Sequence, residues 1–456
     1  MKNKSVLKAM GIILGITFLL TWIIPSTTVT KSGLTLGSIA GTGFADIFST
    51  IEILLIYFAK PAVFILFVGM FYQVASKTGA LKSLVKNITK IFKKEPYILL
   101  IATVLFYSVT TAMTGIYIPM FMFIPLSIAI LTELKYNKLE AILATAGAST
   151  IGLIGELSNS IIKSMIGDEE NKFIWIKLGV LVVLAVLTIL FILFVKNKNV
   201  KSTKEENIAF ELVDSKKQSK GISLFVIIVL LFIVFVLGLT PWNSNVTTMF
   251  NDAYTAIKNV KIGNFAIISS ILGVFEIFGS WTYTSLYPTI ALAIIVLAVS
   301  NKLSVKDTFE ACVDGAKRVS GLAVVALLLN IVTIFALNSG FVGTLINLIA
   351  KGGNVALVTL STLVAAPFFT DMNYVAQYVL SILNTAIGNA DMLPTYGYIL
   401  QVINGLVLLI VPSSILLMIT LGYTEEKYSS WAKYIWKLLL AIFVAVLISI
   451  VLVIVL

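Results

Sequence analysis

Long apolar runs separated by short charged segments dominate this sequence and limit the folds open to it. Residues 175–195, 222–239 and 431–456 contain few charged residues, and each run is long enough to cross a bilayer as a helix. Of the 456 residues, 59% are hydrophobic and 12% are charged. Soluble domains are about 45–50% apolar and about 25% charged. The sequence therefore predicts an all-α polytopic membrane protein embedded in a lipid bilayer.

The net charge of +11 comes mainly from lysines in short segments between the apolar runs. The positive-inside rule accounts for this placement, so nucleic acid is not an expected partner. Histidine is absent and Cys312 is the single cysteine, which excludes an internal disulfide and a cysteine zinc site. We expect no metal site and no cofactor. Without histidine, coupling must be to Na⁺, to H⁺ through carboxylates, or to a counter-substrate.

Some apolar runs are interrupted by proline, glycine and small polar residues. One helix through residues 96–134 would be about 58 Å long, roughly twice the hydrocarbon thickness of a bilayer. The interruption at Thr110–Gly115 instead predicts an inner re-entrant hairpin over 96–134. Similar interruptions predict an outer re-entrant hairpin over 354–389 and broken helices over 139–164 and 395–420.

The same features recur in the same order in the two halves of the chain. Gly79 and Gly340 are each followed by apolar residues at the same four offsets, and Gly152 and Gly405 are each followed by serine eight residues later. The segment after Gly79 is rich in lysine and predicts an amphipathic helix on the cytoplasmic side, whereas the segment after Gly340 is expected outside. These positions predict two inverted repeats. Broken helices at corresponding positions of inverted repeats indicate a secondary transporter with a site near the midplane of the membrane.

The charged segment 197–220 is predicted to be a cytoplasmic linker between two halves. Residues 1–196 would hold scaffold spans, the inner hairpin and the first broken helix. Residues 221–456 would hold a linking span, the outer hairpin and the second broken helix, giving about eleven transmembrane helices. The lysines place the N-terminus in the cytoplasm and the C-terminus outside a multi-pass protein of the cell membrane. Residues 264–280 fit either a span or a re-entrant segment.

Polar residues beside the helix breaks are the predicted substrate site. Broken helices present amide groups to anions and carbonyl groups to cations, and Ser, Thr and Asn add neutral donors and acceptors. An ionisable group at membrane depth is costly, which favours a functional role for Asp371. The alternative is that such residues cap broken helices or join them together. The predicted substrate-binding residues are Thr111, Thr114, Gly115, Ser158, Asn159, Ser160, Thr370, Asp371, Asn373, Asn404, Ser413 and Ser414. The candidates for cation coupling are Glu156, Glu276 and Asp371.

Five short segments carry a further signal: Trp22–Pro25, Lys77–Leu81, Gly152–Asn159, Pro412–Ser414 and Tyr428–Tyr434. Together they resemble the YfcC and DcuC-like anaerobic carriers of the ion transporter superfamily. The resemblance covers most of the chain. It implies a homodimer in which a transport domain moves against a scaffold domain by an elevator motion. It also implies substrates among four-carbon dicarboxylates or basic amino acids.

The sequence departs from this family pattern at two places. The family usually carries acidic residues after the first hairpin glycine, whereas Gly115 is followed here by Ile116–Pro119. The tip of the second hairpin is usually rich in serine and glycine, whereas this chain has Phe369–Asn373. Both changes fall at the predicted site, so the substrate does not follow from the resemblance.

The leading functional expectation is secondary active transport of a small molecule, by elevator-type exchange or cation-coupled uptake. The apolar runs contain no arginine that could pair with two carboxylates, which favours an amino acid, with a basic one such as arginine or ornithine as the narrower candidate. The alternative is a C4-dicarboxylate or similar organic anion, because helix N-termini bind carboxylates unaided. A membrane-embedded enzyme and a channel are remote alternatives. The sequence offers no aligned nucleophile and base, and paired broken helices imply alternating access.

One prediction concerns the costly carboxylate. Replacing Asp371 by asparagine should abolish transport or change its ion coupling, because the side chain loses its charge and keeps its size. The folded protein should remain intact. Flux and coupling measured in proteoliposomes check this, and wild-type values for Asp371→Asn would contradict it.

Overall fold

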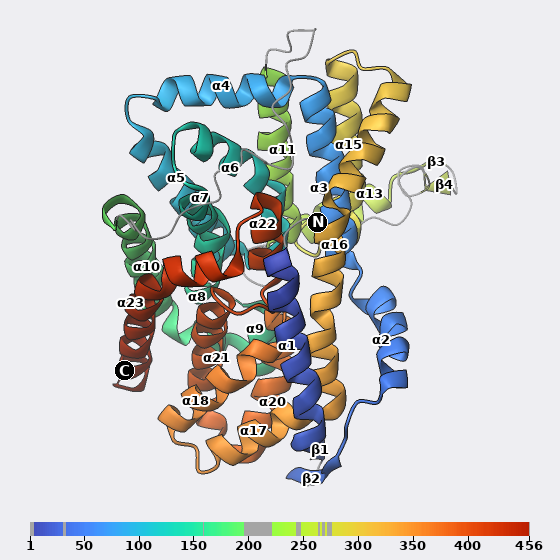
Figure 1. Cartoon of the computed structure of the whole chain (residues 1–456). Coiled ribbons are helices and arrows are strands. Elements are labelled where there is room, and N and C mark those ends of the chain that lie inside the picture. Colours follow the sequence, from blue (N-terminus) through green and yellow to red (C-terminus); the bar gives the residue numbers. More distant parts are fainter. Residues whose placement is uncertain are drawn as a thin grey trace.

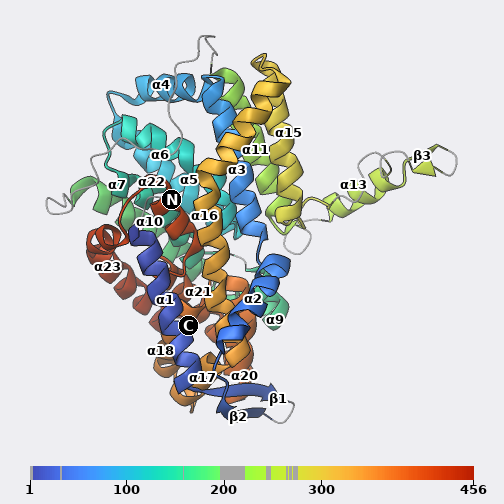
Figure 2. The same ribbon diagram turned by 45° about the vertical axis from the view of Figure 1, so that its right-hand side comes forward.

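The fold is nearly all helical, and its long helices pack side by side along the long axis of the molecule (Figure 1). The computed structural model describes residues 4–30, 33–157, 159–195, 221–242, 248–262, 265–266, 270 and 276–455. The predicted linker 197–220 and most of 264–280 therefore lie outside the described residues. Figure 2 shows α13 and β3 projecting from the helical body.

The elements before the linker are α1 (Lys4–Ile23), β1 (Pro25–Thr30), β2 (Gly33–Ile39), α2 (Phe44–Tyr57), α3 (Lys60–Lys77), α4 (Ala80–Phe92), α5 (Pro96–Thr114), η1 (Ile118–Met122), α6 (Ile124–Glu133), α7 (Lys138–Ile142), η2 (Leu143–Gly147), α8 (Ala148–Ile154), α9 (Ser160–Ile166), η3 (Gly167–Phe173) and α10 (Ile174–Phe194). Because η2 is a π-helical turn, α7, η2 and α8 form one continuous helix.

The elements after the linker are α11 (Ile222–Leu239), α13 (Met249–Lys258), β3 (Lys261–Ile262), β4 (Phe265–Ala266), α15 (Tyr283–Ser300), α16 (Val305–Ser339), α17 (Phe341–Ala350), α18 (Val355–Ala365), η4 (Ala366–Phe368), α19 (Met372–Val375), η5 (Ala376–Leu380), α20 (Ser381–Ile387), η6 (Ala390–Met392), α21 (Leu393–Leu408), α22 (Ile415–Thr424) and α23 (Tyr428–Val455). The π-helical turn η5 joins α19 and α20 into one helix.

Within the described residues, seven helices are long and apolar enough to cross a membrane. They are α1, α5, α10, α11, α15, α16 and α23. The pair α2 and α3 is bent by 60° just before Pro61 and adds an eighth span if counted as one. The protein is therefore a multi-pass, all-helical membrane protein in its spanning part. The expected total of about eleven spans included the shorter broken helices, and that total stays a prediction.

Two short helices lie at opposite ends of the bundle. The amphipathic α4 that the sequence predicted lies across the top of Figure 1 with Leu81, Leu84 and Val85 buried, and α17 lies at the bottom. Each begins after a glycine in the left-handed region, Gly79 with φ 75° and Gly340 with φ 66°. This placement supports the predicted inverted repeats, which stay a prediction.

The N-terminal segment contains a small β-hairpin that the all-α expectation did not include. Strands β1 and β2 pair antiparallel, and β1 packs on α17. The hydroxyl of Thr27 lies 2.7 Å from that of Thr344, and the Thr27 amide donates to the Gly340 carbonyl over 3.2 Å. Alternating apolar and polar residues in 25–39 were the sequence signal for these strands.

Helix α16 is the longest helix among the described residues. Sequence reasoning would separate its polar beginning from the apolar span that follows, but the structure has one helix of 35 residues. The hydroxyl of Ser304 caps its start by accepting from the Asp307 amide over 3.0 Å. It packs against α3 where Gly69 meets Gly315. A methyl group added to Gly315 would lie 2.3 Å from the Gly69 carbonyl oxygen.

The close crossing of α3 and α16 predicts that adding one methyl group there lowers the stability of the protein. Gly315→Ala should lower the stability of the protein by about 1–3 kcal/mol, because backbone atoms of α3 cannot move aside. Gly179→Ala is the matched control in α10, where an added methyl group meets nothing within 4 Å. Thermal unfolding in detergent should show a lower Tm for the first variant only. Equal melting temperatures for both variants would contradict the tight crossing.

Candidate functional site

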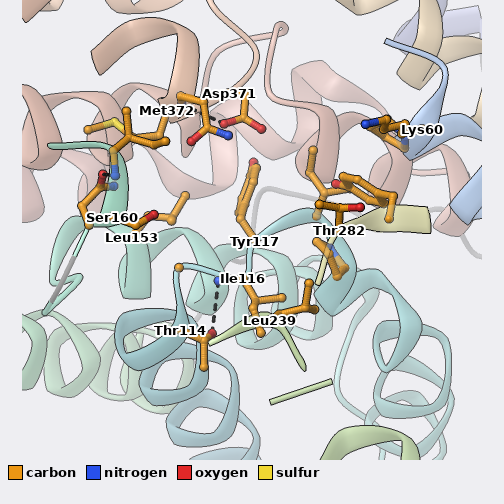
Figure 3. Close-up of a pocket in the computed structure, with 18 of the residues that line it drawn as sticks. Lys60, Thr114, Ile116, Tyr117, Leu153, Ser160, Leu239, Thr282, Asp371 and Met372 are labelled. Carbon is orange, nitrogen blue, oxygen red and sulfur yellow. Dashed lines mark hydrogen bonds between the residues drawn. The ribbon is translucent and has the colours of Figure 1, made fainter. Parts of the chain in front are cut away.

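A cavity of about 650 Å³ lies where the helix breaks meet (Figure 3). The turn after α5, the break between α8 and α9, the start of α19 and the break between α21 and α22 all contribute to its wall. Helices α3 and α16 and the residues before α15 complete the lining. The interruptions that the sequence placed far apart therefore surround a single space.

The break between α8 and α9, here called the first break, presents Glu156 to the cavity. Asn159 caps α9 by accepting from the amides of Ile161 and Ile162 over 3.1 and 2.9 Å. Its side-chain nitrogen donates to the Glu156 carboxylate over 3.0 Å. One asparagine therefore starts the helix and orients the acid at the same time.

Gly115 faces this acid at the end of α5. Its φ of 66° lies in the left-handed region, where glycine carries no steric penalty. A methyl group at this position would lie 2.6 Å from Oε1 of Glu156. Both the turn and the close approach of the acid therefore require glycine here.

The second hairpin presents Asp371, whose carboxylate caps α19 by accepting from the Asn373 amide over 2.9 Å. The preceding residue, Thr370, is fully buried and fixes the tip to α16. Its amide donates to the Thr333 hydroxyl over 3.0 Å, and its own hydroxyl donates to the Asn330 side-chain oxygen over 2.7 Å. The position of Asp371 is thus set by a buried polar network shared with α16.

Tyr117 joins the two sides of the cavity. Figure 3 shows its ring reaching from the segment of Thr114 and Ile116 toward the side that carries Asp371. The Tyr117 hydroxyl lies 2.5 Å from that of Ser414, in the break between α21 and α22. This contact links the turn after α5 to the break between α21 and α22.

The structure brings seven of the predicted binding or coupling residues to the cavity: Thr114, Gly115, Glu156, Asn159, Ser160, Asp371 and Asn373. Five others support the wall without lining it. The supporting contacts are Thr111 to the Ile116 carbonyl, Thr370 to Asn330, Asn404 to the Met372 sulfur, Ser413 to the Pro367 carbonyl, and Ser414 to Tyr117. Ser158 lies outside the described residues.

Glu276, a predicted coupling candidate, does not line the cavity. Its carboxylate accepts from the Thr282 amide over 2.9 Å and from the Ser285 hydroxyl. These bonds hold the chain segment that enters α15, and residues of this segment line the cavity. The contacts give Glu276 a positioning role in the wall.

Several lining residues were not among the predicted site residues: Lys60, Tyr117, Thr282, Asn330, Tyr374 and Gln377. Two of them carried a usable signal. Asn330 is an amide in the middle of an apolar run, and Lys60 precedes the proline at the bend between α2 and α3. Tyr117 and Tyr374 lie within two residues of Gly115 and Asn373 in the sequence, whereas Thr282 and Gln377 carried no such signal.

A multi-pass helical protein with a central cavity enclosed by paired helix breaks has the architecture of a secondary transporter. The chain belongs to the C4-dicarboxylate anaerobic carrier (DcuC) family, whose sequence model matches residues 40–455. The DcuC part of the resemblance is thereby confirmed, and its YfcC part stays a prediction. No curated protein matches the sequence.

Two solved structures resemble the chain weakly. The Alcanivorax borkumensis YdaH transporter aligns over 99% of this chain and 98% of its own, with 13% identity and a TM-score of 0.41. MtrF of Neisseria gonorrhoeae, from a class of antimetabolite efflux pumps, aligns over 98% and 95%, with 10% identity and a TM-score of 0.40.

The first break generates a prediction with an internal control. Asn159→Ala removes a helix cap and the hydrogen bond to Glu156, whereas Asn137→Ala removes only the cap of α7. Each should cost about 0.5–2 kcal/mol of stability. Only Asn159→Ala should also weaken substrate binding, measured as the ligand-induced rise in Tm. An unchanged ligand shift in Asn159→Ala would show that the break does not serve the site.

Proposed function

We propose that the protein is a secondary transporter of four-carbon dicarboxylates or similar small organic anions. The family match over residues 40–455 is the observation that carries this proposal. It favours the anion alternative over the leading sequence expectation of an amino acid. The elevator motion and the homodimer implied by the resemblance belong to the same proposal.

Helix N-termini at the cavity support an anionic substrate. The helix formed by α19, η5 and α20 begins at Met372, and α22 begins at Ile415, and both residues line the cavity. Asp371 already accepts from the Asn373 amide at the first of these starts, whereas the start of α22 has no side-chain cap. Unpaired amides there attract negative charge. Lys60 adds the one cationic side chain among the described lining residues. These groups could bind a carboxylate at each end of a short dicarboxylate.

The acids in the wall support coupling to cations. Glu156 and Asp371 bring two negative charges to the cavity against the single positive charge of Lys60. A dianion would raise the net negative charge further, and uncompensated charge in a poorly solvated site is costly. We therefore propose cation-coupled uptake or exchange in which these acids face the coupling cations rather than the substrate.

The same two acids favour a second candidate, which is exchange of a basic amino acid. Its side-chain cation would pair with Glu156 or Asp371, and its carboxylate would meet a helix N-terminus. This candidate needs no coupling cation. Its substrate would compensate the charge of the acids directly.

A counterflow screen in proteoliposomes separates the candidates. Vesicles preloaded with each unlabelled compound would be tested against succinate, fumarate, arginine and ornithine, with and without Na⁺ or a pH gradient. We expect succinate and fumarate to exchange, and uptake to depend on the cation. Exchange of arginine or ornithine alone would overturn the dicarboxylate proposal in favour of the second candidate.

Lys60→Gln sharpens the same screen. Loss of the positive charge should raise KM for dicarboxylates about tenfold or more, the scale of a lost charge-assisted hydrogen bond. Lys351→Gln, after α17 and away from the cavity, is the matched control and should leave KM unchanged. Equal KM values for the two variants would remove Lys60 from the site.

A further inference from the structure

Two buried amide side chains on α21 are not used by the cavity. Gln401 and Asn404 are each 2% exposed, and neither lines the cavity. They are three residues apart, so they lie on the same face of the helix. Each contacts a different part of the site: Gln401 meets the first break, and Asn404 meets the tip of the second hairpin.

Their hydrogen bonds fix which way each amide points. The nitrogen of Gln401 donates to the carbonyls of Ile154 and Glu156 over 3.2 and 2.8 Å. The nitrogen of Asn404 donates to the sulfur of Met372 over 3.2 Å. Turning either amide over would place its oxygen against an acceptor, which is repulsive. The two side-chain oxygens must therefore point away from these partners.

Neither oxygen has a hydrogen-bond partner among the described residues. A buried acceptor without a donor costs free energy, and native structures leave few such groups without a hydrogen-bond partner. Two such oxygens, three residues apart on α21, point to a ligand beside this face of the helix. A ligand at this place must donate hydrogen bonds or carry positive charge.

The surroundings favour positive charge. The helix formed by α7, η2 and α8 ends at Ile154, and its last carbonyls carry the negative end of the helix dipole. The chain continues directly to the acid Glu156, which lies at the cavity wall. On the other side, Asn404 touches Met372, which follows Asp371. Half-helix C-termini and unwound carbonyls of this kind coordinate coupling cations in transporters.

We infer that the side-chain oxygens of Gln401 and Asn404 are ligands of a monovalent cation of the size of Na⁺. Two neutral amide oxygens suit a single charge, whereas calcium sites gather several carboxylates. The described residues contain no group of three acidic, cysteine or histidine side chains that could hold a metal. This inference rests on the proposed function, because it assigns the coupling ion of the same transporter.

The position of the site explains how an ion and a substrate would be coupled. A cation between the two oxygens would hold α21 against both the first break and the tip of the second hairpin. Those two elements carry Glu156 and Asp371 at the cavity. Binding of the ion would therefore order the substrate site without any contact between ion and substrate, which is a coupling free energy between two sites.

Thermal unfolding of the purified protein in detergent tests the inference without any substrate. Tm would be measured in NaCl, KCl and choline chloride at constant ionic strength. We expect a saturable rise with Na⁺ that choline does not give. No difference between Na⁺ and choline in the wild-type protein would overturn the inference and indicate a buried water at the two oxygens.

Variants then locate the ion. Asn404→Leu keeps the volume and removes the oxygen, so the apparent Na⁺ affinity should fall at least about tenfold. Asn404→Asp keeps an oxygen and adds charge, so the affinity should rise, and it serves if the leucine variant does not fold. Thr188→Val removes a buried hydroxyl on another helix, α10, where it donates to the Leu184 carbonyl over 2.8 Å, and this variant should behave as wild type. Wild-type Na⁺ affinity in Asn404→Leu, or a fall in Asn404→Asp, would place the ion elsewhere.

This outcome is independent of the substrate. A Na⁺-dependent Tm with no dicarboxylate counterflow would keep the ion site and reject the proposed substrate. Dicarboxylate counterflow with no effect of Na⁺ on Tm would do the reverse.

Discussion

Backbone groups released at a helix break inside a membrane must find partners within the protein, because lipid offers none. In this structure the breaks satisfy one another. The Leu157 amide donates to the Ala112 carbonyl over 2.8 Å, which ties the first broken helix to the first hairpin. The Ser413 hydroxyl donates to the Pro367 carbonyl over 2.7 Å, which ties the second broken helix to the second hairpin. The interruptions are stable only when they are assembled together.

The same requirement creates the cavity at which we propose that the substrate binds. Helix ends that meet in one place bring amide groups, carbonyl groups and their capping side chains together, and the space left between them is the cavity. Asn159 illustrates the double use, because it caps α9 and orients Glu156 with one side chain. Tyr117 and Gln401 extend the principle across the two halves, since each belongs to one half and bonds to the other. The same residues therefore supply hydrogen bonds at the helix breaks and polar groups in or beside the cavity.

Local signals in the sequence predicted the breaks well. Glycine, proline and small polar residues within apolar runs have direct backbone consequences, so the turn at Gly115 and the cap at Asp371 could be expected from neighbouring residues alone. The partners of these breaks could not. Gln401 lies more than two hundred residues from Glu156, and nothing in its neighbourhood indicates that its nitrogen reaches that carbonyl.

Glu276 and Asn404 also make contacts in the folded chain that the sequence did not predict. Glu276 was a candidate for coupling because it is an acid in or near apolar sequence, and in the structure its carboxylate accepts from the Thr282 amide and organises the chain that enters α15. Asn404 was expected to touch substrate, but it contacts Met372 behind the cavity wall. In both cases the type of residue was informative, and its role depended on tertiary contacts that no local pattern contains.

The central claim is that both halves of the chain contribute to one substrate site. Cysteine protection measures this directly. In a Cys312→Ser background, Ser160→Cys and Asn373→Cys would place a thiol at the cavity from the first and second half respectively. Their rates of maleimide modification would be compared with and without a saturating concentration of the substrate found by counterflow. The account predicts that substrate slows both reactions, and protection of neither position, or of one alone, would contradict it.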